Sequence, residues 1–167
     1  MRFLSFLLLA LLIGCTTYKK PEANLNTVTT TFLGGTTKDA YNIKLVFTKE
    51  GKFDFVNSTV TTQVNSLSPT ERDEALKLAT IKAKQKIFEF IKNTIATEQF
   101  IGALQSSIEN SDAVPKHKGT PSNAKLAYLV RDDIKQKSDA ILQGAYVADA
   151  VLDLSSGLIV VTVRSGI

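Results

Sequence analysis

The sequence is poor in the residues that build disulfides and metal centres. Its 167 residues include one cysteine, one histidine and no tryptophan. A single cysteine cannot form an internal disulfide, and the Cys/His spacings of zinc sites are absent. The composition therefore predicts a protein with no metal and no bound cofactor.

Strong charge and long apolar runs are also missing. The net charge is +4 at pH 7, and no basic block is dense enough to predict nucleic-acid binding. The apolar run at residues 3–13, interrupted only by Ser5, is too short to span a bilayer, which takes about 20 residues. It has the length of the hydrophobic region of a signal peptide.

Motifs for catalysis are absent as well. The sequence contains no nucleophile elbow, no HExxH, no P-loop and no GxGxxG. The acidic pair Asp132 and Asp133 is followed by Lys135 and Lys137 at helical spacings of three and four. That spacing favours surface ion pairs over a metal site, and we predict that the protein is not an enzyme.

The apolar run ends in a motif for lipid attachment. Residues 12–15 read Leu-Ile-Gly-Cys, which resembles the bacterial lipobox. The resemblance implies a diacylglycerol on the Cys15 sulfur, cleavage between Gly14 and Cys15, and acylation of the new amino terminus. Thr16 stands where an aspartate would signal retention at the inner membrane, so the resemblance implies the outer membrane. The alternative is an ordinary secretory signal with a cysteine by chance.

A polar segment follows the anchor. We assign residues 1–14 to a removed signal peptide, residues 15–41 to the lipid anchor and a flexible tether, and residues 42–167 to a folded domain. Within the tether, Val28, Phe32 and Leu33 lie among threonines in a β-prone stretch. Instead of a flexible tether, this stretch can be an edge strand that contacts another subunit. In that case, deleting residues 27–33 should weaken assembly and leave the monomer intact.

The domain begins with the pattern of a β-hairpin followed by a helix. Alternating apolar residues predict strands on either side of a turn at Gly51, with a bulge near Val56. Residues 68–71, Ser-Pro-Thr-Glu, form a capping-box signature for a long helix. The core stripe expected for this helix is broadened by four further apolar residues: Leu78, Ile81, Phe88 and Phe90. A membrane-active amphipathic helix is the alternative, disfavoured by the acidic start and the wide apolar face.

The second half of the domain repeats these elements in reverse order. Residues 100–108 have a weak apolar pattern that fits a short helix or a strand, and His117 lies in the polar loop that follows. A helix is predicted from about 122 to 142, ending at a left-handed Gly144, before a hairpin with strands at 145–154 and 158–164. The predicted fold is a single α+β domain of order β-β-α-α-β-β, with two hairpins packed against two helices.

The later segments carry a family resemblance over roughly residues 66–165. The alanine-studded helix "EALKLATIKAKQKIFEFI" and the segment "LQGAYVADAVLDL" resemble the small bacterial outer-membrane lipoproteins that include the flagellar protein FlgP and a Helicobacter lipoprotein antigen. Leu142 and Ala148 depart from the isoleucine and valine usual in that family.

The resemblance implies a choice between two functions. The flagellar branch implies a homo-oligomeric ring or disc at the outer membrane, in contact with other flagellar or envelope proteins. The antigen branch implies a surface-exposed or periplasmic lipoprotein that binds a protein or cell-wall partner. We expect the first function and keep the second as the alternative.

Overall fold

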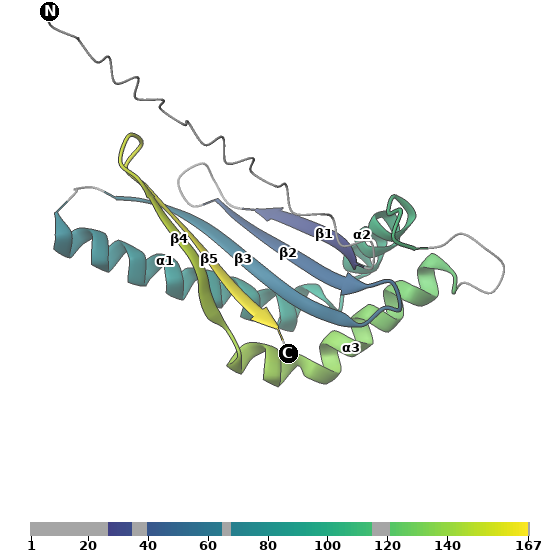
Figure 1. The fold of residues 1–167 in the computed structure, drawn as a ribbon. Coiled ribbons are helices and arrows are strands. Elements are labelled where there is room, and N and C mark those ends of the chain that lie inside the picture. Colours follow the sequence, from purple (N-terminus) through teal and green to yellow (C-terminus); the bar gives the residue numbers. More distant parts are fainter. Residues whose placement is uncertain (1–26, 35–39, 65–67, 115–120, 167) are drawn as a thin grey trace, which may run out of the picture.

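The fold is a five-stranded antiparallel sheet with its helices on one face (Figure 1). The computed structural model describes residues 27–34, 40–64, 68–114 and 121–166. In chain order the elements are β1 (Thr27–Gly34), β2 (Tyr41–Thr48), β3 (Phe53–Gln63), α1 (Pro69–Glu89), the π-helical turn η1 (Phe90–Thr94), α2 (Glu98–Glu109), α3 (Asn123–Gln143), β4 (Tyr146–Asp153) and β5 (Leu158–Gly166). The strand order is β1-β2-β3-β5-β4, so β1 and β4 are the two edges.

The α+β class is confirmed, whereas the predicted order and the two-hairpin arrangement match the structure only roughly. The sheet contains an additional strand, β1, and a third helix, α2. The weak pattern at residues 100–108 is helical, because Phe100, Ile101, Leu104 and Ile108 are all buried at spacings of three and four. The helix predicted at 122–142 is found as α3, one residue further along at each end.

Strand β1 joins the sheet because alternate residues of its threonine-rich sequence reach the core. Val28 is 2% exposed, and the Phe32 ring lies 5.2 Å from the Phe90 ring and 5.7 Å from the Phe100 ring, centroid to centroid. A cluster of three aromatic rings is a strong apolar contact for a short strand. The sheet therefore includes residues 27–34, which the sequence assigned to the tether.

The first hairpin contains the predicted turn and a bulge close to the predicted place. Val46 pairs with Phe55 and Phe47 pairs with Phe53, so Asp54 is the extra residue on β3. In a regular strand, residues 53 and 56 would point to opposite faces. The bulge brings both Phe53 and Val56 to the same buried face. Gly51 has φ of +82°, as the turn prediction requires.

Replacing Gly51 with alanine is expected to lower the free energy of unfolding by about 2 kcal/mol, because the backbone is left-handed there. A Cβ at this position would also lie 2.8 Å from Leu126 Cδ1. A Cβ added at Gly102, inside α2, would meet no atom within 4 Å, so Gly102→Ala is the matched control and should stabilise by about 0.5–1 kcal/mol. Urea denaturation measures both; equal effects would contradict the strain assigned to Gly51.

Helix α1 crosses beneath the centre of the sheet. Its N-cap is the predicted Ser68, whose hydroxyl accepts a hydrogen bond from Glu71 N at 3.3 Å. Ala79, Ala83 and Ile87 are 0% exposed and pack against β3 and β5. The small alanines allow the helix to approach the strands closely.

One local prediction in the second half of the domain is corrected, and strand β4 contains a bulge. Gly144 has φ of −81° and is not left-handed; a Cβ there would lie 3.1 Å from Ala140 O and 3.3 Å from Gly166 O, so close backbone approach favours the glycine. In β4, Val147 pairs with Val163 and Asp149 with Thr162, which makes Ala148 a bulge. This bulge moves Val147 to the helix-side face shared with Ala150.

Candidate functional site

The edge strand β4 carries three exposed apolar side chains. Tyr146, Val147 and Val151 are 54%, 44% and 51% exposed. Helix α1 packs mainly against β2, β3 and β5. Tyr146 and Val151 lie on the face of β4 opposite the helices, and Val147 lies on the helix side. An uncovered edge strand with apolar side chains and unpaired backbone groups is suited to pairing with another strand.

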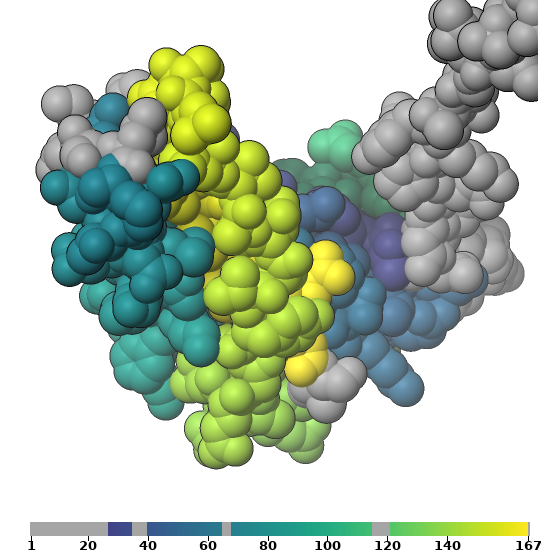
Figure 2. All heavy atoms as spheres, turned by 60° about the vertical axis from the view of Figure 1, so that its left-hand side comes forward, coloured from purple at the N-terminus to yellow at the C-terminus, as the bar shows by residue number. Residues whose placement is uncertain are grey.

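A hollow separates β4 from the first turns of α1. Its volume is about 310 Å³, and its lining includes Leu76 from α1, Ala150 and Leu152 from β4, and Ile159 from β5. Figure 2 shows the two elements that border it, α1 in teal and β4 in yellow-green. A strand added beside β4 would direct alternate side chains toward this hollow.

One polar group borders the hollow without a hydrogen bond. Arg72 Nε is buried and has no partner among the described residues. The neighbouring Asp73 carboxylate is 3.2 Å from Lys77 Nζ in an exposed pair. The hollow is thus mainly apolar, with one guanidinium at its rim.

The turn that ends β4 is organised by Asp153. Its Oδ1 accepts hydrogen bonds from Ser155 N at 2.9 Å and Ser155 Oγ at 2.6 Å, and Oδ2 accepts one from Ser156 Oγ at 2.6 Å. These bonds lower the pKa of Asp153 to about 2. Because the carboxyl pKa is lowered in the folded turn, ionised Asp153 stabilises the turn fully at pH values above the ordinary pKa of 3.8. This stabilisation is lost as the pH falls toward 2.

The residues predicted as oligomer contacts on β1 fall into two groups. Val28 and Phe32 pack inside the monomer, whereas Leu33 is 81% exposed. Leu33 is the most accessible of the three to another subunit. The backbone of β1 that faces away from β2 is the second open edge of the sheet.

The acidic pair on α3 makes ion pairs and one tertiary hydrogen bond. Asp133 Oδ2 is 2.9 Å from Lys137 Nζ, as predicted, and also accepts a hydrogen bond from Phe53 N at 2.7 Å. Asp132 pairs with Arg131 at 2.8 Å. Asp133 therefore helps to hold α3 against the first hairpin.

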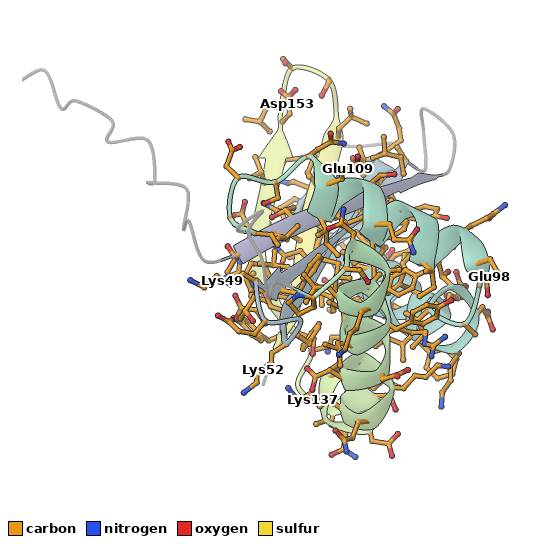
Figure 3. All side chains as sticks on the ribbon, turned by 90° about the vertical axis from the view of Figure 1, so that its right-hand side faces the viewer. Lys49, Lys52, Glu98, Glu109, Lys137 and Asp153 are labelled. Carbon is orange, nitrogen blue, oxygen red and sulfur yellow. The ribbon has the colours of Figure 1, made fainter. Side chains whose placement is uncertain are left out.

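The acidic groups labelled in Figure 3 do not converge. Glu98, Glu109 and Asp153 lie at separate places on the periphery (Figure 3). Within the described ranges, no group of three or more His, Cys, Asp or Glu side chains has a metal-binding arrangement. No helix in those ranges is long and apolar enough to cross a membrane.

Cys15, the predicted lipidation site, lies outside the described residues. So do Gly14, which precedes it at the predicted cleavage site, and His117. The sequence did not identify Tyr146, Val147 and Val151 as an exposed group. The sequence does contain a pattern that could have indicated their exposure. Apolar residues occur at both odd and even positions of this strand, and Asp149 and Asp153 lie among them.

Comparison with known proteins identifies no relative of this chain. No family model, no curated protein and no solved structure matches it.

Proposed function

We propose that this chain is a non-enzymatic, lipid-anchored lipoprotein of the outer membrane that self-assembles as an envelope scaffold. The flagellar form of the proposal is a basal-body ring or disc of the FlgP type, needed for motility. The anchor comes from the lipobox at Cys15, and the flagellar role comes from the resemblance over residues 66–165. The observation that carries self-assembly is the uncovered edge strand β4, with Tyr146, Val147 and Val151 all at least 44% exposed.

The charges on β4 favour a head-to-tail contact over a symmetric one. Asp149, Val151 and Asp153 share one face of β4. Antiparallel pairing of two β4 strands centred on Val151 would place Asp149 of each copy opposite Asp153 of the other, and like charges directly opposite are unfavourable. Strand β1 has no charged residue, so pairing of β4 with β1 of the next copy avoids this repulsion. A head-to-tail contact of this kind generates rings when it closes.

The assembly contact is tested by Val151→Lys, which places a charge in the middle of the β4 edge. We expect the lipid-free chain from Cys15 onward to change from large assemblies to monomers, because edge lysines block strand pairing. Leu129→Lys on α3 is the matched control, since Leu129 is 43% exposed and lies away from either edge. Analytical ultracentrifugation measures both. A wild-type chain that stays monomeric at high concentration would refute self-assembly, and unchanged assembly of Val151→Lys would refute the β4 contact.

The alternative function is a surface or periplasmic lipoprotein that binds a protein or cell-wall partner. The hollow between α1 and β4 favours it, because a partner strand could pair with β4 and fill the hollow. Gene deletion separates the two proposals at the cellular level. The flagellar proposal requires loss of motility with normal growth, whereas the alternative requires normal motility and one stoichiometric partner recovered without self-association.

A further inference from the structure

The outward side of α1 carries large apolar side chains that the fold leaves uncovered. Leu78, Ile81 and Phe88 are 48%, 62% and 49% exposed. At 100° per residue these three lie within an arc of roughly 80°, on the side of the helix opposite Ala83. The sequence predicted that they broaden the core stripe; of the four residues named for that role, only Phe90 is buried.

Basic residues surround this apolar arc. No acidic residue lies between Glu74 and Glu89, and that stretch contains four lysines, Lys77, Lys82, Lys84 and Lys86. Lys86 is paired with Glu89 at 2.7 Å, and Lys77 is paired with Asp73 at 3.2 Å. The positive charge that this face offers therefore comes from Lys84 and Lys92. One turn further on, Lys92 Nζ lies 5.9 Å from the centre of the Phe88 ring. Lysines beside exposed apolar side chains are typical of helices that lie in a membrane interface, because their stems bury while the ammonium groups reach the headgroups.

We propose that the outward face of α1, formed by Leu78, Ile81, Lys84 and Phe88, docks on an anionic phospholipid surface. Lys84 and Lys92 supply charge complementarity to anionic headgroups, and the three apolar residues supply contact with the acyl boundary. The acidic start of the helix, which argued against membrane contact in the sequence, lies in the turns before Leu78; Glu74 continues the line of this arc one turn earlier. The contact goes beyond assembly, and a lipid anchor would strengthen it by raising the local concentration of the helix at the membrane.

This docking orients the whole domain. Helix α1 lies beneath the sheet (Figure 1), so the opposite face of the sheet would point away from the lipid. The edges β1 and β4 would then point sideways. Copies could pair along the membrane plane while each α1 stays in contact with the lipid.

The absence of tryptophan allows a direct test with a single fluorescent reporter. The chain from Cys15 onward, which contains every described residue, is coupled through the Cys15 thiol to a maleimide lipid in vesicles of phosphatidylcholine and phosphatidylglycerol. Phe88→Trp reports the docking face, and Tyr146→Trp reports the sheet edge as the matched control. Brominated acyl chains quench a tryptophan that contacts the membrane.

We expect several-fold stronger quenching of the Phe88→Trp reporter than of the Tyr146→Trp reporter. Adding Ile81→Glu to the Phe88→Trp chain should reduce the quenching to the control level. Replacing phosphatidylglycerol by phosphatidylcholine should do the same, because it removes the anionic headgroups. Raising the salt concentration should also do so, because it screens the attraction between lysines and headgroups. Equal quenching of the two reporters, or stronger quenching of Tyr146→Trp, would overturn the proposal. No effect of Ile81→Glu, with folding checked by circular dichroism, would also overturn it. Because the anchor is imposed chemically, these outcomes are independent of whether Cys15 is lipidated in the cell.

Discussion

Phe32→Ala is expected to lower the free energy of unfolding by about 3 kcal/mol, the lower end of the range for buried phenylalanine truncations. Phe32 packs against the rings of Phe90 and Phe100, at 5.2 Å and 5.7 Å between centroids. Its removal therefore leaves a cavity between β1 and α2 and takes away two aromatic contacts. Urea denaturation of the lipid-free chain gives the value.

The neighbouring residue provides the control for Phe32. Leu33 is 81% exposed, so Leu33→Ala should change the free energy of unfolding by less than about 0.5 kcal/mol. Equal losses for the two variants, or no loss for Phe32→Ala, would contradict the placement of β1 in the core.

Membership of β1 in the core also changes how assembly can be tested. Deleting residues 27–33 removes Val28, which is 2% exposed, together with Phe32. We therefore expect the deletion to destabilise the monomer, contrary to the expectation from the sequence. Loss of assembly in that deletion would say nothing about a contact between subunits. Substitutions at Leu33 or Val151, which are exposed, separate assembly from folding.

Cys15→Ser is expected to move the protein from the membrane fraction to the soluble fraction. The lipobox interpretation attaches acyl chains at Cys15, and each buried methylene contributes about 0.8 kcal/mol to membrane binding. Two or three chains make attachment effectively permanent, whereas serine cannot accept the thioether. Mass spectrometry of the wild-type amino terminus should show the lipid on Cys15 and no residues before it.

A second variant tests sorting separately from attachment. Thr16→Asp keeps Cys15 and should stay in the membrane fraction, with the protein retained at the inner membrane instead of the outer one. Unchanged membrane attachment of Cys15→Ser, together with an unmodified Cys15 in the wild type, would contradict the anchor.

Local signals in the sequence predicted much of the secondary structure. Ser68 begins α1 through its own hydroxyl, Gly51 takes the positive φ that its turn requires, and the apolar spacing after Ser122 predicts α3 almost to its ends. Each depends on residues a few positions apart, whose geometry is set by steric limits and short-range hydrogen bonds. The lipobox prediction likewise rests on four consecutive residues.

Only the tertiary structure decided which surfaces are covered. The sheet order depends on pairs such as Thr59 with Thr162, and β1 enters the core because Phe32 meets Phe90 and Phe100. The same packing leaves β4 at the edge of the sheet and leaves Leu78, Ile81 and Phe88 on the outside of α1. The spacing of apolar residues along the sequence is the same whether a distant strand buries a given residue or leaves it exposed to water. Its burial is decided by contacts between residues far apart in the chain, and periodicity carries no information about those.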